Sequence, residues 1–189
     1  LEALKTLGIK IKKDKNIWEV FGNGIGNLSG SNYKLDLGNS GTGSRLLMGL
    51  IAGSDVEATI LGDESLSKRP MKRIIKPLLK TGAIFDNPIN DNLPIKIRGS
   101  KIPLPLEYNS PVASAQIKSS ILLAGLSSIG NTTVIEPALS RDHTERMLKY
   151  LGAEITTTKL SNSSWKITLK GLPSLKPLDI EIPSDPSSA

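Results

Sequence analysis

The stretch LKYLGAEITTTKLSNSSWKITLKG, residues 148–171, decides the fold because the chain carries this pattern three times. In each copy an apolar helix end meets a glycine, and a short strand, a polar turn, an alternating strand and a closing glycine follow. A glycine directly after a helix suits the left-handed C-terminal cap, and apolar residues at every second position predict a strand. The other copies are LKTLGIKIKKDKNIWEVFG, residues 4–22, and LLKTGAIFDNPINDNLPIKIRG, residues 78–99.

The copies recur at intervals of about 70 to 75 residues, which indicates a repeated structural unit. Between them lie an apolar helix, a strand and a second helix, so the predicted unit is βαβαββ. The middle unit is expected to contain a helix at 45–53, a strand at 56–62 and a helix at 65–82, and the last unit has their counterparts at 114–126, 132–137 and 140–152. We therefore predict an α/β (α+β) fold in which helices pack together inside and sheets lie outside.

Two finer expectations follow from periodicity. The helix at 65–82 should bury one apolar stripe, and the second strand of each hairpin should have one apolar face. The stripe consists of Met71, Ile74, Ile75, Leu78 and Leu79, and the strand positions are Trp18 and Val20, Ile95 and Ile97, and Ile167 and Leu169.

The first unit is represented only from the end of its last helix. At the other end, residues 179–182 resemble a strand that leads into a proline-rich crossing. We expect residues 1–183 to form most of one globular domain, with one partial and two complete units. Residues 184–189 should begin a crossing into a second domain.

The composition favours small anionic partners. Lys and Arg outnumber Asp and Glu by 24 to 18, which gives a net charge of +6 and a field that attracts anions. The basic run KIKKDK at 10–15 is short and aromatic residues are scarce, so nucleic acid is not the expected partner. There is no Cys and a single His, so neither a disulfide nor a metal site is expected. Without a long apolar run or a signal layout, the sequence predicts a cytoplasmic protein that does not bind membranes.

The first candidate anion site is LDLGNSGTGSR, residues 35–45. Asn39, Ser40 or Thr42 can cap the helix that follows, while Gly41 and Gly43 leave backbone N–H groups open to a ligand. A glycine-rich cap without a ligand is the alternative. The stretch is not a P-loop, because Ser-Arg replaces Lys-Ser/Thr, and GNGIGN at 22–27 is better explained as the exit from a hairpin.

The second candidate is SLSKRPM, residues 65–71, where Lys68 and Arg69 are expected at a helix N-terminus with Pro70 in the first turn. Cations there oppose the helix dipole, so a bound anion would offset the cost. Two solvated cations are the alternative. Lys72 and Arg73 are expected to face water.

The third candidate combines PVASAQIKSS, residues 111–120, with SRDHTER, residues 140–146. Ser114 and Gln116 offer a hydroxyl, an amide and backbone donors before an apolar helix, with Lys118 expected on the outer face.

In the second of these stretches, Ser140 or Asp142 should cap the next helix, with Glu145 closing a capping box. Arg141 stands at a helix start as Arg69 does. His143 falls at the spacing of Met147 and Leu151 and is expected to be partly buried.

Four motifs together resemble the 5-enolpyruvylshikimate-3-phosphate synthases, and most closely their second class, in which SAQ and RDHTE are typical. The match follows the whole chain in order. The motifs are LDLGNSGTGSRLLMGL (35–50), GDESLSKRPMKRIIKPL (62–78), ASAQIKSSILLAGL (113–126) and EPALSRDHTERMLKYLGAEI (136–155).

The resemblance implies one domain of a two-domain inside-out α/β barrel and transfer of an enolpyruvyl group from phosphoenolpyruvate to shikimate 3-phosphate, without metal or organic cofactor. It implies a monomer that is the target of glyphosate, with Gly41 leaving room for this phosphonate. It places Asn39, Gly41, Arg69 and Gln116 at phosphoenolpyruvate. It places Ser114, the backbone of Ala115, Gln116, Ser140 and Arg141 at shikimate 3-phosphate.

The resemblance also implies that the family's first substrate-binding lysine and arginine precede Leu1, and that its catalytic Asp, Glu and Lys lie beyond Ala189. No catalytic residue is therefore expected in this chain, and the chain alone is expected to be inactive. Two alternatives stay open: the related transferase that acts on UDP-N-acetylglucosamine, and a basic RNA-binding module built from the same unit. An inert folding domain is a third possibility for the isolated chain.

Overall fold

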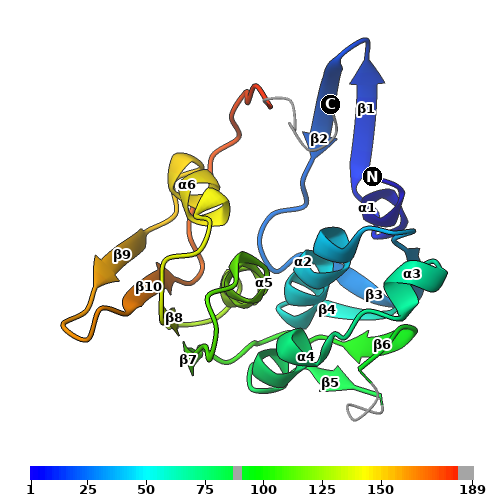
Figure 1. Cartoon of the computed structure of the whole chain (residues 1–189). Helices are drawn as coiled ribbons and strands as arrows, with labels where there is room; N and C mark the ends of the chain where they lie inside the picture. Colours follow the sequence, from blue (N-terminus) through cyan, green and yellow to red (C-terminus); the bar gives the residue numbers. More distant parts are fainter. Residues whose placement is uncertain (87–90, 183–189) are drawn as a thin grey trace.

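Two units with the same order of elements make up most of the fold (Figure 1). The computed structural model describes residues 1–86 and 91–182. The middle unit contains β3 (Ser29–Asp36), α2 (Gly41–Ala52), β4 (Asp55–Leu61), α3 (Glu64–Ser67), α4 (Lys72–Leu79), β5 (Ile84–Phe85) and β6 (Ile95–Arg98). The last unit contains β7 (Glu107–Asn109), α5 (Ala115–Gly125), β8 (Asn131–Glu136), α6 (His143–Tyr150), β9 (Ile155–Lys159) and β10 (Trp165–Lys170).

The sheets of the two units have the same topology. Their strand orders are β3-β4-β6-β5 and β7-β8-β10-β9. In each sheet the first pair is parallel and the other two pairs are antiparallel. This pairing confirms the predicted βαβαββ unit.

The helices meet between the sheets, where α2 packs against α5. The two backbones approach so closely that a Cβ atom on Gly49 would lie 2.2 Å from the carbonyl oxygen of Ser120. Glycine is therefore required at this crossing. Buried residues of α2, α5 and both sheets form the main apolar core, including Met48, Ile60, Ile97, Ile121 and Val134.

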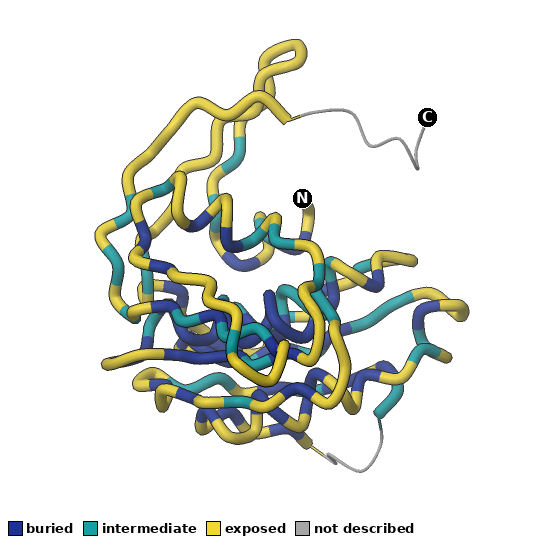
Figure 2. The backbone as a smooth tube through the Cα atoms, turned by 60° about the vertical axis from the view of Figure 1, so that its left-hand side comes forward, coloured by how far each residue is buried: buried dark blue, intermediate teal, exposed yellow. Residues whose placement is uncertain are grey.

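Only part of the first copy of the hairpin pattern joins this core. Its helix α1 (Glu2–Thr6) buries Ala3 there, whereas its strands β1 (Lys10–Asp14) and β2 (Ile17–Phe21) pair, within the described residues, only with each other. Trp18 is 46% exposed and Val20 is 57% exposed, so the expected apolar face is not buried here. Figure 2 shows the exposed hairpin projecting from the buried helices and sheets. The strand pattern is correct, but no described element covers this face.

The expected helix at 65–82 is broken into α3 and α4. Pro70 lies between them, and a proline disfavours helical backbone at the residue before it. Met71, Ile74, Ile75 and Leu78 are buried as predicted, whereas Leu79 is 39% exposed.

The glycines that follow the repeated helices behave as predicted. Gly8, Gly82 and Gly152 have φ angles of +85°, +95° and +99°, which is the left-handed conformation of a helix C-terminus. Residues 179–182 form no strand, contrary to expectation. The expected crossing at 184–189 lies outside the described residues.

Candidate functional site

The N-terminus of α2 is capped by Ser40. Its Oγ accepts a hydrogen bond from the backbone N–H of Gly43 over 3.1 Å. The other two side chains that the sequence offered as caps, those of Asn39 and Thr42, instead bond to distant parts of the chain. They link the start of α2 to two other elements.

Asn39 lies against Arg69. The Arg69 guanidinium donates from Nη2 to Asn39 Oδ1 and, over 3.4 Å, to Ser65 Oγ. Arg69 belongs to the connection between α3 and α4, so the expected position at a helix N-terminus is wrong. Lys68 is the C-cap of α3 and pairs with Glu64 at 2.6 Å, where a cation agrees with the helix dipole.

Arg45 brings a second guanidinium to this point. Its Nη1 donates to the carbonyl oxygen of Gly41 over 3.2 Å, and its Nη2 donates to that of Pro70 over 3.3 Å. Burial lowers the pKa of Arg45 from its usual value, and the charges of Arg69 and Arg73 lower it further. We call Arg45, Arg69 and Arg73 the guanidinium cluster.

The guanidinium cluster favours a bound anion. Arginine stays protonated in proteins, so its members repel one another until a negative charge compensates them. Of the three arginines in this cluster, the sequence predicted a site role only for Arg69. An arginine one turn into α2, after a first turn that holds no acidic residue, is the signal by which Arg45 could also have been found.

Gly41 lies directly beneath two of these guanidinium groups. A Cβ atom at this position would lie 3.0 Å from Nη1 of Arg45 and 3.0 Å from Nη1 of Arg69. The missing side chain therefore leaves the space in which both guanidinium groups approach the start of α2.

Thr42 connects this region to the last unit. Gln116, in the first turn of α5, donates from Nε2 to Thr42 Oγ1 over 2.8 Å. Both residues line a concavity of about 190 Å³, which we call the polar hollow; its other lining residues are Leu46, Ala115, Ser119, Arg141, His143 and Thr144. Gly41, Arg69, Gln116 and Arg141 thus lie along one continuous surface at the N-terminal ends of α2 and α5.

The remaining predicted site residues flank the polar hollow. Ser114 is the N-cap of α5, and its Oγ accepts from the N–H of Ile117 over 3.4 Å. Ser140 lies before α6 and donates from Oγ to Glu136 Oε2 over 2.8 Å. The structure therefore brings Ser114, Ala115, Gln116, Ser140 and Arg141 to one end of the last unit.

Three expectations for this end of the unit are wrong. Lys118 is fully buried rather than on the outer face, and it lies 2.6 Å from Glu145. Because Glu145 faces Lys118, it closes no capping box, and the N-cap Asp142 makes no side-chain cap bond. His143 is exposed, because α6 buries Glu145 and Leu148 on its inner face.

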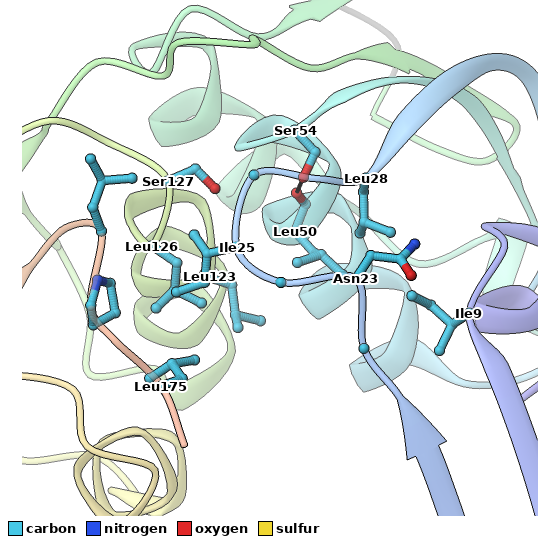
Figure 3. Close-up of a pocket in the computed structure, with 15 residues that line it drawn as sticks. Ile9, Asn23, Ile25, Leu28, Leu50, Ser54, Leu123, Leu126, Ser127 and Leu175 are labelled. Atoms are coloured by element: carbon cyan, nitrogen blue, oxygen red, sulfur yellow. Dashed lines mark hydrogen bonds between the residues drawn. The ribbon is translucent and has the colours of Figure 1, made fainter. Parts of the chain in front are cut away.

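A larger cavity of about 560 Å³ lies at the opposite ends of α2 and α5 (Figure 3). Apolar side chains from several elements face it, among them Ile25, Leu50, Leu123 and Leu175. None of the described residues that line it carries a charged side chain, and an anionic ligand requires positive charge.

Within residues 1–86 and 91–182, no group of three or more His, Cys, Asp or Glu side chains gathers that could hold a metal ion. None of the helices in these ranges has the length and apolar character needed to cross a membrane.

Comparisons with known proteins match this arrangement to one family along the whole chain. The sequence profile described as EPSP synthase (3-phosphoshikimate 1-carboxyvinyltransferase) matches residues 1–189. The chain belongs to the EPSP synthase family. This assignment confirms the resemblance that the four motifs indicated.

Individual members of the EPSP synthase family support this assignment. A 3-phosphoshikimate 1-carboxyvinyltransferase of Novosphingobium aromaticivorans is 50% identical over 188 residues, which are 99% of this chain and 43% of that protein. One from Methylorubrum extorquens is 49% identical over 191 residues, 99% of this chain and 42% of the relative. The chain thus spans about two fifths of the length of these curated relatives.

The fold also matches a solved structure of the family. The EPSP synthase of Acinetobacter baumannii superimposes with a TM-score of 0.81 at 40% identity, over 92% of this chain and 38% of that one. The expected class of fold, one domain of the enolpyruvyl transferase architecture, is therefore confirmed.

Proposed function

We propose that the protein carrying this chain transfers the enolpyruvyl group of phosphoenolpyruvate to the 5-hydroxyl of shikimate 3-phosphate. In this reaction the 5-oxygen bonds to C2 of phosphoenolpyruvate, the hydroxyl proton is lost, and the bond from C2 to the phosphate oxygen breaks through a tetrahedral intermediate. The products are 5-enolpyruvylshikimate 3-phosphate and inorganic phosphate. This chain supplies substrate-binding residues and no catalytic acid or base.

One observation carries the proposal. The guanidinium cluster and the polar hollow are adjacent, because Thr42, which lines the hollow and accepts a hydrogen bond from Gln116, directly follows Gly41 at the two guanidinium groups of Arg45 and Arg69. Each substrate carries a phosphate and a carboxylate, so two multiply charged anions must meet on one surface. Fixed guanidinium groups and oriented donors bind such groups and stabilise charge that develops during transfer.

The two parts of the surface suit different substrates. In this proposal Asn39, Gly41 and Arg69 bind phosphoenolpyruvate, because they lie at the guanidinium cluster. Gln116, at the junction of the two parts, contacts both substrates.

Shikimate 3-phosphate takes the polar hollow and its rim. Ser114, the backbone N–H of Ala115 and Ser140 contact its phosphate, and Arg141 lies near the ring. Ser140 Oγ now donates to Glu136, so it must turn its proton toward the phosphate when the ligand binds.

In the same proposal, the protein acts in the cytoplasm, as a monomer, and without a metal or organic cofactor. Neither the UDP-N-acetylglucosamine transferase nor the RNA-binding alternative gains support from the family assignment.

Titration of each anion into the chain tests the proposal. We expect shikimate 3-phosphate to shift the backbone amide signals of Ser114, Gln116 and Arg141, and phosphoenolpyruvate to shift those near Gly41. Equal concentrations of inorganic sulfate serve as the control for unspecific anion binding. Salt-dependent binding of RNA with no response to either substrate would contradict the proposal.

Activity requires the complete protein that contains this chain. We expect it to release inorganic phosphate only when both substrates are present. Release of phosphate with UDP-N-acetylglucosamine in place of shikimate 3-phosphate would favour the related transferase instead.

A further inference from the structure

Three ionisable side chains are buried together beside the polar hollow. Lys118 Nζ lies 3.0 Å from Glu136 Oε1 and 2.6 Å from Glu145 Oε1, and the three side chains are 0%, 1% and 7% exposed. We call these residues the buried triad. Within the described part of the chain the Glu145 carboxylate accepts no hydrogen bond, so its ion pair with Lys118 is what holds it in place.

Each member of the buried triad comes from a different element. Lys118 belongs to α5, Glu136 is the last residue of β8, and Glu145 lies in α6. The same elements carry the residues proposed for shikimate 3-phosphate: Gln116 precedes Lys118 by two positions, and the connection from β8 to α6 contains Ser140 and Arg141. The buried triad therefore ties together the parts of the chain that surround this ligand.

Glu136 binds the connection between β8 and α6 directly. Its Oε1 accepts a hydrogen bond from the backbone N–H of Ser140 over 2.9 Å, and its Oε2 accepts one from Ser140 Oγ over 2.8 Å. Lys118 Nζ also reaches the carbonyl oxygen of Ser140 at 3.5 Å. Three polar atoms of Ser140 are thus fixed by the buried triad, and Arg141 follows as the next residue.

Stability alone does not account for these charges. Burying two carboxylates and an ammonium group costs desolvation energy that their attraction only partly offsets, and apolar side chains of similar volume often give a more stable protein. A satisfied buried polar network does fix the relative positions of the elements that it joins. The buried triad therefore serves to fix the relative positions of α5, β8 and α6.

We propose that Lys118, Glu136 and Glu145 are positioning residues for the shikimate 3-phosphate part of the site. They hold Ser140 and Arg141 at a fixed distance from Ser114, Ala115 and Gln116. This inference rests on the proposed function. It assigns no ligand contact to the three residues themselves.

The inference predicts an unequal effect on the two substrates. Asn39, Gly41 and Arg69 lie in the middle unit, and none of the polar contacts that the buried triad makes within residues 1–86 and 91–182 reaches them. Disruption of the buried triad should therefore weaken the binding of shikimate 3-phosphate and leave that of phosphoenolpyruvate nearly unchanged. A general loss of stability would affect both.

The experiment compares KM values for both substrates in the complete protein. Lys118→Met should raise the KM for shikimate 3-phosphate by about tenfold or more, equivalent to about 1.4 kcal/mol, and alter the KM for phosphoenolpyruvate by less than about twofold. Glu136→Gln keeps an oxygen that can accept from the Ser140 N–H, so it should give a smaller rise than Glu136→Ala.

Two control variants separate position from stability. Leu122→Ala removes a fully buried side chain one turn further along α5; it destabilises the same helix and leaves the polar contacts of the buried triad in place. Lys170→Met makes the same substitution at a lysine whose side chain is 61% exposed and which pairs with Glu154. Both should leave the ratio of the two KM values unchanged.

Hydrogen exchange at the Ser140 amide provides a readout that needs no substrate. We expect faster exchange at Ser140 in Lys118→Met and Glu136→Ala than in the wild type or Leu122→Ala. Equal rises of both KM values, or no rise, would overturn the inference. If the wild-type protein bound neither substrate, the proposed function would fail, and unaltered exchange at Ser140 would then overturn the positioning role as well.

Discussion

Gln116 donates a hydrogen bond to Thr42 over 2.8 Å and so joins the first turn of α5 to the first turn of α2. The two residues belong to different repeats. Because both units place the N-terminus of their first helix at the same end, this contact makes one surface from two equivalent helix starts. In the proposed function, the free backbone N–H groups of both helices face the same ligands.

Removal of the Thr42 hydroxyl tests this junction. Thr42→Val deprives the Gln116 amide of its acceptor, and the loss of one hydrogen bond costs about 0.5–1.5 kcal/mol. We expect the affinity for shikimate 3-phosphate to fall roughly two- to tenfold, measured by titration. Thr157→Val, on β9 away from the predicted site residues, is the matched control and should change nothing.

Gly41→Ala tests the space beneath the guanidinium cluster. The new methyl group would lie 3.0 Å from Nη1 of both Arg45 and Arg69, whose flexible ends can shift by a few tenths of an ångström. We expect little change in stability and a modest rise in the KM for phosphoenolpyruvate. Inhibition by the bulkier glyphosate should weaken more, by about 10- to 200-fold, because a misplaced methyl group in a pocket has effects of this size.

The comparison requires KM and inhibition constants from the same preparations. Gly22→Ala is the control, because a Cβ atom there meets nothing within 4 Å. An equal loss of affinity for the substrate and the inhibitor would contradict the steric explanation.

Arg69→Gln tests the electrostatic cost of the guanidinium cluster. Removing one cation relieves the repulsion that lowers the pKa of Arg45. The free energy of unfolding without ligand should therefore stay equal or rise slightly. Phosphoenolpyruvate at a hundredfold excess over its Kd should stabilise the wild type by about 2.7 kcal/mol and the variant far less. Thermal unfolding with and without the ligand measures both effects, and Lys72→Gln at an exposed position is the control.

Lys118→Met should be strongly destabilising. It leaves the carboxylates of Glu136 and Glu145 buried without their cation, and breaking a buried pair in this way costs about 3–5 kcal/mol. Lys170→Met breaks an exposed pair with Glu154 and should cost at most about 1 kcal/mol. Urea unfolding of both variants gives the comparison. Equal losses would show that the buried charges are not coupled as their distances indicate.

The ion pair between Asp142 and Arg146 should make the stability of the fold depend slightly on pH. The hydrogen bond from Arg146, together with its charge, lowers the pKa of Asp142 below its usual value. A lowered carboxyl pKa contributes stability above the unfolded-state pKa, and this contribution is lost as the pH falls through the folded-state pKa. Arg146 is largely exposed and Asp142 partly so, so solvent screens the effect and keeps it small.

Titration of the Asp142 carboxyl by NMR checks this expectation. Arg146→Gln should raise the pKa of Asp142 toward its usual value. Lys149→Gln removes a charge from the same helix without touching the pair and should leave that pKa close to the wild-type value.

Local patterns in the sequence were sufficient to predict the repeated unit. Apolar periodicity reports which face of a strand or helix is buried, and a glycine after a helix reports a left-handed cap. Gly82 and Gly152 therefore marked the ends of α4 and α6 correctly. The same local logic singled out Asn39, Gly41, Gln116 and Arg141 near helix starts, and it singled out Arg69 although this residue lies between two helices. The roles of all five toward the substrates stay predictions.

The exposed strand β2 shows the limit of this reasoning. The alternation of Trp18 and Val20 identifies a strand with an apolar face, but burial of that face requires another element to cover it. Such a contact depends on distant parts of a chain, which a local pattern does not contain.

The sequence by itself determined the order of helices and strands, the repeat and the excess of positive charge, because these properties depend on neighbouring residues and on composition. Only the tertiary structure decided which polar side chains meet. Lys118 has the sequence context of a solvent-facing lysine, yet it is buried because carboxylates from β8 and α6 reach it. Desolvation of a charge is tolerated only where opposite charges are brought within contact distance, and folding alone creates that arrangement.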